Sequence, residues 1–120
     1  MNLEIKFRVW VPSINKFRNF LFVLDLNGIC LEEIGYGETE VNKEAIIQQY
    51  TGLVDKNKKE IFEGDIIKFN SGLKYFIDFK NGRWIMTFKD GNSKKINENI
   101  VKLFQIEIIG NIFENPDLLK

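Results

Sequence analysis

Short segments of alternating apolar and polar residues, separated by turn-forming pairs, limit this chain to a sheet-built fold. Successive side chains of a strand point to opposite faces, so a period of two predicts a strand with one buried face. Residues 3–11 and 73–79 show this pattern most clearly. Turn signals stand at Asn27-Gly28, Ser71-Gly72 and Asn81-Gly82. The first pair is a strong hairpin signal because both of its residues tolerate a positive φ.

The same reasoning predicts an order of elements along the whole chain. We expect strands over residues 3–11, 17–26, 29–34, 65–70, 73–79, 83–88 and 104–110, a hairpin tip at 55–59 and one helical turn at 97–103. The segment 17–26 is apolar on both faces, which favours a central strand. The acidic segment 37–44 is expected to be a loop. Residues 45–50 fit either a strand or one helical turn.

The fold class follows from the spacing of these elements. Short antiparallel strands joined by tight turns favour a small barrel or rolled sheet, which leaves few exposed strand edges. We therefore predict a mostly β chain, β-rich α+β at most, with an N-terminal antiparallel sheet or hairpins followed by a small SH3-like barrel or rolled sheet. A single domain over 1–120 is expected, with a soft boundary between an N-terminal sheet at 1–50 and a small β-barrel at 51–120.

The chain lacks the residues on which the commonest catalytic sites depend. It contains no histidine and one cysteine, Cys30. This composition excludes Ser-His-Asp and Cys-His nucleophiles, His-ligated metals and Cys₄ zinc. Cys30 is interpreted as a small buried hydrophobe of a reducing compartment. We assign no catalytic residue, metal ligand or cofactor, and we expect a protein that is not an enzyme.

Two carboxylates keep one catalytic alternative open. Glu63 and Asp65 flank Gly64, and residues at i and i+2 of a strand share a face. The pair is suited to acid–base work or to magnesium binding. A turn acid followed by a strand-opening acid is the simpler interpretation, so a metal-dependent enzyme that uses Glu63 and Asp65 is the second alternative.

Charge is balanced overall and uneven along the chain. The seventeen basic and seventeen acidic residues give a formal net charge of zero, so the chain as a whole lacks the strongly basic character typical of nucleic-acid binding. Residues 1–20 carry a net positive charge and residues 25–44 a net negative charge. Solvated surface is the simplest interpretation, with a binding face or packing between subunits as alternatives.

Two places offer a basic and aromatic surface. Lys6, Arg8 and Trp10 fall on the polar side of the first predicted strand, a combination suited to stacking on bases or to a protein hot spot. Arg83 is the second candidate. Alternation places its neighbour Trp84 on the opposite face, where we expect the core.

The sequence also predicts where the protein works. Its first residues alternate apolar and charged side chains and have no signal-peptide form. The longest apolar run, residues 20–24, is far shorter than the ~20 residues needed to span a bilayer. We expect a soluble cytoplasmic protein without membrane contact.

Three segments together resemble the YopX family of phage and prophage proteins. They are IKFRVW at 5–10, QYTGLVDKNKKEIFEGDII at 49–67 and IIGNIFENPDLL at 108–119, in the family's order and over nearly the whole chain. Where many relatives have Asn-Gly-Lys at the hairpin tip, this chain has Asn57-Lys58-Lys59. The resemblance implies a phage-encoded, β-rich protein without an assigned activity, so it provides no catalytic residues to transfer.

These observations favour a phage accessory protein of unassigned activity. We expect a non-enzymatic binding module that acts through protein–protein contacts in the host bacterial cell. Its expected partners are further copies of itself and an unidentified host or phage protein. The first alternative is a nucleic-acid-binding module that uses a basic and aromatic face.

Overall fold

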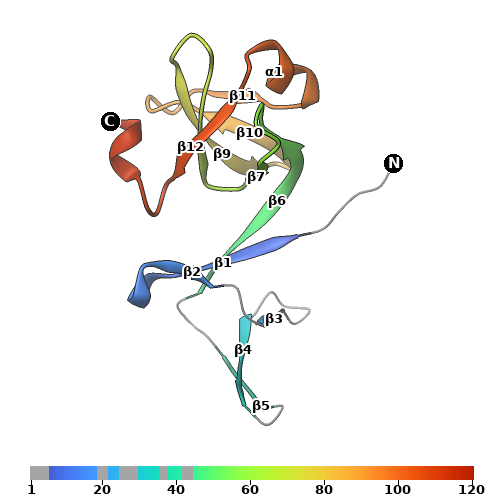
Figure 1. The fold of residues 1–120 in the computed structure, drawn as a ribbon, viewed down its shortest axis with the longest axis vertical. Helices are drawn as coiled ribbons and strands as arrows, with labels where there is room; N and C mark the ends of the chain where they lie inside the picture. The colour runs from blue at the N-terminus through green and yellow to red at the C-terminus, as the bar shows by residue number, and fades with distance from the viewer. Residues whose placement is uncertain (1–5, 19–21, 25–29, 36–37, 42–44) are drawn as a thin grey trace. The chain divides into compact units, whose positions relative to one another are not determined.

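The computed structural model describes residues 6–18, 22–24, 30–35, 38–41 and 45–120 (Figure 1). Contacts divide the chain into two compact units. The main unit comprises residues 1–6 and 49–120, and the small unit comprises residues 7–48. The predicted single domain with a boundary near residues 50–60 stays a prediction, because a division by contacts does not test independent folding.

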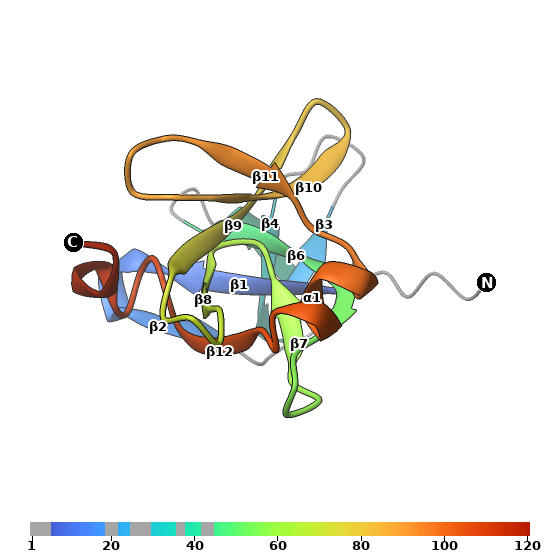
Figure 2. The same ribbon diagram turned by 90° about the horizontal axis from the view of Figure 1, so that it is seen from above.

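The main unit is built around a curled antiparallel sheet that forms a half-barrel (Figure 2). Its five strands lie in the order β11-β10-β9-β8-β12. The elements are β7 (Glu60–Phe62), β8 (Asp65–Lys68), β9 (Lys74–Lys80), β10 (Arg83–Thr87), β11 (Ser93–Lys95), α1 (Glu98–Leu103), β12 (Glu107–Asn111) and the 3₁₀ turn η2 (Pro116–Leu119). Strand β6 (Ile46–Val54) enters this unit at residue 49 and pairs with β7. The mostly β prediction is confirmed.

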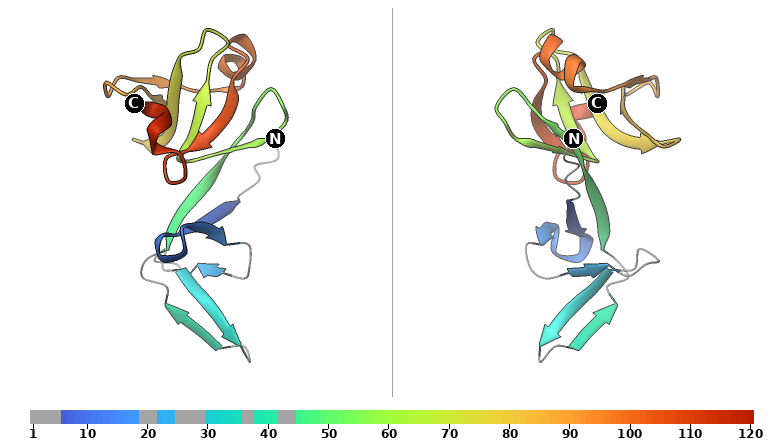
Figure 3. Two further views of the ribbon diagram at one scale, coloured as in Figure 1. Left: turned by 60° about the vertical axis from the view of Figure 1, so that its left-hand side comes forward. Right: turned by 90° about the vertical axis from the view of Figure 1, so that its right-hand side faces the viewer.

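The small unit contains two groups of short strands. Its elements are β1 (Phe7–Val11), the 3₁₀ turn η1 (Pro12–Ile14), β2 (Lys16–Arg18), β3 (Phe22–Leu24), β4 (Cys30–Gly35) and β5 (Glu38–Val41). Strand β1 lies between β2 and β6, and β4 lies between β3 and β5. Figure 3 shows β4 and β5 running side by side in opposite directions, as their antiparallel register requires.

One apolar cluster holds the main unit together. Alternation places Tyr75 and Ile77 of β9 on one face, and Ile77 stands directly opposite Met86 of β10. The buried members are Ile61, Ile67, Phe69, Tyr75, Ile77, Met86, Ile96, Val101 and Ile106. Each large side chain of this kind stabilises the fold by about 1.5–3 kcal/mol when fully buried. The half-barrel is therefore stabilised by the packing of this cluster.

The described hairpin turn at Asn81-Gly82 forms at the position that the sequence predicts. Asn81 and Gly82 adopt φ of 54° and 76°, and their flanking residues Lys80 and Arg83 stand directly opposite each other. Two central residues with positive φ are typical of the tight turn that best fits the twist of paired strands. Asn27-Gly28 lies outside the described residues. The predicted helical turn is confirmed as α1, whose first turn is capped by the Asn97 side chain accepting from the Ile100 N–H at 2.9 Å.

Several predictions for the first half of the chain are wrong. The expected central strand at 17–26 is instead divided between β2 and β3, which belong to different sheets and are outer strands in the described order. The expected loop at 37–44 contains β5, because these residues pair with β4. Of the two alternatives for residues 45–50, the strand is confirmed from residue 46 onward, as part of β6. In the second half of the chain, the sequence gives no signal for strand β11, since its three residues are all exposed and show no apolar alternation.

The helices in the described part of the chain are short. None of them is long and apolar enough to cross a membrane.

Candidate functional site

Lys6, the first predicted binding residue, is engaged within the main unit. Its Nζ lies 2.6 Å from Glu60 Oε2 and 5.8 Å from the centre of the Tyr50 ring. Both partners come from the β6–β7 hairpin. The ammonium group is half-exposed, and its nearest carboxylate already supplies a counter-charge.

Arg8 and Trp10 belong to the small unit and share a packed cluster with Phe17. Arg8 Nε donates to Gln48 Oε1 at 2.8 Å, and its guanidinium carbon lies 4.4 Å from the centre of the Phe17 ring. The Trp10 and Phe17 ring centres lie 4.9 Å apart in an edge-on arrangement. Trp10 is only 3% exposed, so the expectation of a surface position is corrected. Phe17 covers it because the two residues stand directly opposite each other on β1 and β2.

Arg83 is exposed at the start of β10, as alternation predicts. Trp84 turns to the other face and packs against the core cluster, with its ring centre 4.8 Å from that of Phe79. The four predicted binding residues therefore belong to three separate clusters of contacts, around Glu60, around Phe17 and on the β9–β10 hairpin. Partner binding by any of them stays a prediction.

The carboxylates of the catalytic alternative bind backbone amides. Asp65 is 2% exposed, and its Oδ2 accepts from the Phe62 N–H at 2.8 Å. Glu63 Oε1 accepts from the Gln49 N–H at 3.4 Å. No group of three or more possible metal-ligating side chains occurs among the residues that the structure describes. Asp65 thus closes the turn between β7 and β8, and Glu63 joins this turn to β6.

A third acid, missed at the level of sequence, organises the β6–β7 hairpin. Asp55 is 4% exposed, and its Oδ1 accepts from the N–H groups of Asn57 and Lys59 at 2.8 and 2.9 Å. Its Oδ2 accepts from the Ile108 N–H at 3.0 Å and so joins the hairpin tip to β12. An Asp at the first position of a turn is the available sequence signal, because its side chain caps amides two and more residues ahead.

At the tip of this hairpin the sequence differs from the pattern of the family that it resembles. Lys58, where the resemblance implies glycine in many relatives, adopts φ of 63°. A residue with a Cβ is disfavoured there by about 1 kcal/mol. The bonds made by Asp55 hold the turn in this conformation.

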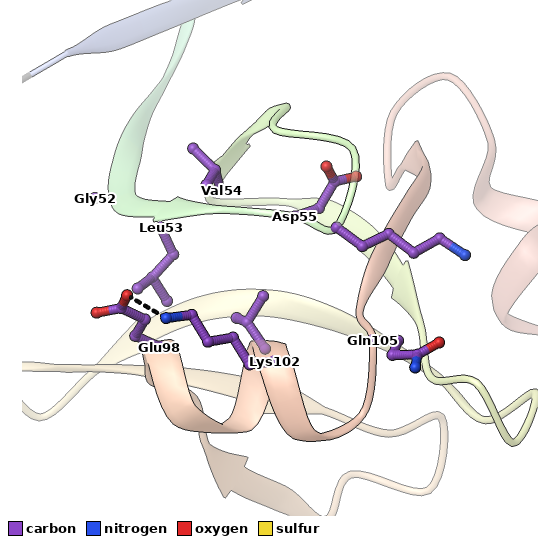
Figure 4. A pocket seen from close by; sticks show the side chains of 9 residues that line it. Gly52, Leu53, Val54, Asp55, Glu98, Lys102 and Gln105 are labelled. Atoms are coloured by element: carbon purple, nitrogen blue, oxygen red, sulfur yellow. Dashed lines mark ion pairs between the residues drawn. The ribbon is translucent and has the colours of Figure 1, made fainter.

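A hollow of the main unit lies between this hairpin and α1. We call it the hairpin–helix groove; its volume is about 390 Å³. It is lined by Gly52, Leu53, Val54, Asp55, Lys56, Glu98, Val101, Lys102 and Gln105. Figure 4 shows Leu53 pointing toward Glu98 and Lys102 of α1, whereas the next residue, Val54, points away from the helix at the edge of the groove. Sequence reasoning missed it because its two halves lie more than forty residues apart along the chain.

Charges at the groove are internally paired. Glu98 Oε1 lies 3.0 Å from Lys102 Nζ, and Lys56 Nζ lies 3.3 Å from Glu107 Oε2. The other lining side chains are the aliphatic Leu53, Val54 and Val101 and the polar Asp55 and Gln105, and Val54 is 43% exposed. The groove thus offers an apolar surface with a neutralised rim.

A family model described as YopX protein matches residues 6–120. The chain belongs to the YopX family. The resemblance seen in the three sequence segments is therefore confirmed, and no curated protein matches the chain.

Two crystal structures have a fold similar to that of this chain. Protein EF1440 from Enterococcus faecalis is 27% identical, with a TM-score of 0.75 over 99% of this chain and 100% of that one. Protein yopX from Bacillus subtilis is 18% identical, with a TM-score of 0.64 over 95% of this chain and 97% of that one. The second likeness concerns the fold alone.

Proposed function

We propose that this YopX-family chain is a non-catalytic accessory protein of a phage or prophage that acts by binding another protein in the bacterial cytoplasm. The observation that carries the proposal is the hairpin–helix groove, an apolar hollow whose flanking charges already have partners. The buried acids support the non-catalytic part, because Asp55 and Asp65 accept hydrogen bonds from backbone amides.

The chemistry of the groove favours an aliphatic occupant. Interface centres are depleted of charged residues and are dominated by buried apolar anchors. Leu53, Val54 and Val101 supply that surface here. A charged ligand would have to compete with the Glu98–Lys102 and Lys56–Glu107 pairs, which are 3.0 and 3.3 Å apart.

The shape of the groove favours a protein segment. One wall is a strand end with its turn and the other is a helix, and the exposed Val54 extends the apolar surface. A segment that presents two or three aliphatic side chains on one face can bind across both walls, as amphipathic segments do in other grooves.

Photo-crosslinking tests this assignment directly. A photoreactive phenylalanine analogue at Val54, in the full chain produced in bacterial cells, should yield a defined crosslinked product. The same analogue at Lys89, an exposed residue of the β10–β11 turn, is the matched control and should not yield it. The identified product, purified separately, should bind wild-type protein and bind Val54→Lys at least tenfold more weakly. Equal crosslinking from both positions, or unchanged binding by Val54→Lys, would contradict the proposal.

A second copy of the chain is the first partner to test. The sequence carries segments of opposite net charge at 1–20 and 25–44, which favours association between copies. Light scattering during size-exclusion chromatography should give a mass above that of one chain at low salt. A monomer at every salt and protein concentration would eliminate the homo-oligomer and leave the heterologous partner.

A further inference from the structure

A second hollow on the main unit has the opposite electrostatic character. We call it the cationic groove; it lies on β9–β11 and has a volume of about 350 Å³. Its lining residues are Lys80, Asn81, Arg83, Ile85, Ser93, Lys94 and Lys95. Strand pairing gathers them, since Arg83 stands opposite Lys80 and Ile85 stands opposite Lys95.

The cations of this groove outnumber the acids beside it. Asp78 Oδ2 lies 3.6 Å from Lys80 Nζ, and this is the one ion pair that a groove cation makes within the described part of the chain. Lys80 and Arg83 face each other directly across the hairpin. Like charges in that position destabilise a strand pair, so an anion bound between them stabilises the fold.

One exposed aromatic ring, that of Phe79, lies on the same hairpin. Phe79 is 45% exposed and contacts Trp84, with ring centres 4.8 Å apart. The two residues stand opposite each other on β9 and β10, one position from the Lys80–Arg83 pair. Cations that follow a backbone, combined with an exposed ring, are the two components of single-strand binding sites.

We propose that the cationic groove binds the phosphate backbone of single-stranded nucleic acid, with a base stacked on Phe79. Arg83 supplies a planar fork for phosphate oxygens, and the lysines supply point charges around it. A flexible single strand can bend around the Asn81-Gly82 turn and so reach both faces of the hairpin. A rigid duplex cannot follow that path.

The proposal goes beyond the protein-binding function and uses different residues. Val54 and the hairpin–helix groove take no part in it. Loss of partner binding in Val54→Lys therefore leaves it untouched, and failure of nucleic-acid binding leaves the protein-binding function untouched.

Fluorescence anisotropy with a labelled twenty-nucleotide oligo-thymidine tests the proposal on the full-length protein. We expect binding at 50 mM salt that weakens at least tenfold in Arg83→Ala/Lys95→Ala. Each lost phosphate contact should lower the slope of log affinity against log salt by about 0.7. Phe79→Ala should weaken binding about tenfold through lost stacking. The control Lys89→Ala removes an exposed lysine outside the groove and should bind as wild type. Thermal unfolding of every variant verifies that the fold is retained.

Three further ligands test whether the groove prefers single-stranded nucleic acid to other polyanions. A duplex of the same length, polyglutamate and vesicles containing phosphatidylserine are compared at equal salt. Tighter binding of the single strand, sensitive to Phe79→Ala, supports the proposal. Equal or tighter binding of polyglutamate or vesicles would assign the groove to acidic proteins or to membranes and overturn it. Absence of binding at 50 mM salt, or an equal loss in Lys89→Ala, would also overturn it.

Discussion

The hairpin–helix groove and the cationic groove of the main unit are similar in volume. They differ in whether their charged side chains form ion pairs. The hairpin–helix groove measures about 390 Å³ and the cationic groove about 350 Å³. Lys56 and Lys102 of the first are paired with carboxylates, whereas Arg83, Lys94 and Lys95 of the second form no ion pair among the described residues. Size alone therefore does not indicate the ligand. The balance of charge around each hollow points to an apolar partner for one and a polyanion for the other.

The largest effect that distinguishes the grooves is expected from Asp55→Ala. The substitution removes the acceptor of three backbone amides in a buried position and should lower the free energy of unfolding by about 3 kcal/mol. Because these bonds hold the hairpin wall, binding at the hairpin–helix groove should be lost first. Urea unfolding, with partner and oligonucleotide binding measured on the folded fraction, checks both results. A loss below 1 kcal/mol would show that Asp55 does not organise the hairpin.

Asp65→Asn tests whether the two acids of the catalytic alternative, Glu63 and Asp65, have a structural role. An amide replaces a buried carboxylate acceptor of the Phe62 N–H, so we expect a loss of about 2 kcal/mol in the free energy of unfolding. Magnesium titrated into the wild-type protein should give no heat in calorimetry. A binding heat that disappears in Asp65→Asn, without loss of stability, would instead support the metal-dependent alternative.

Salt should separate the two grooves without any substitution. Three phosphate contacts at the cationic groove predict a loss of about twentyfold in oligonucleotide affinity between 50 and 200 mM salt. Partner binding at the hairpin–helix groove should change less than twofold, because its charges are internally paired. Parallel titrations at the two salt concentrations provide the measurement. An equal salt dependence for both ligands would remove the electrostatic distinction between the grooves.

Lys58→Gly is expected to have the smallest effect. Glycine adopts the φ of 63° without strain, while its greater freedom in the unfolded chain offsets part of the gain. The free energy of unfolding should rise by at most about 1 kcal/mol, and both binding activities should be unchanged. Lys59→Gly, in the same turn, is the control, since Lys59 is not among the described residues with a positive φ. A stabilisation by Lys59→Gly of the same size would contradict this explanation.

Local patterns predict the main unit well because its strands have one buried face and tight turns. Tyr75, Ile77 and Met86 fall on the core side as alternation requires, and Asn81-Gly82 forms the expected turn. Strand β5 could not be found in this way. Its acidic residues show no apolar face, and the strand exists through its pairing with β4.

The candidate sites were harder to predict than the fold because they depend on contacts between distant residues. Alternation alone assigns Trp10 to the surface, whereas it is buried and contacts its cross-strand neighbour Phe17. Arg83 was selected from its sequence position. The residues that join it, Lys94 and Lys95, reach the same hollow only through the pairing of β10 with β11. Whether a given lysine forms an ion pair can be judged only from the structure, which shows its neighbours.

The bond between Asp55 and Ile108 also has a consequence for synthesis of the chain. The β6–β7 hairpin emerges from the ribosome some fifty residues before Ile108, whose N–H donates the last of the three hydrogen bonds to Asp55. Until β12 arrives, one carboxylate oxygen must remain hydrated and the hairpin end stays open to water. Nascent chains halted before residue 108 should therefore be cleaved by proteases at this tip, whereas completed chains resist.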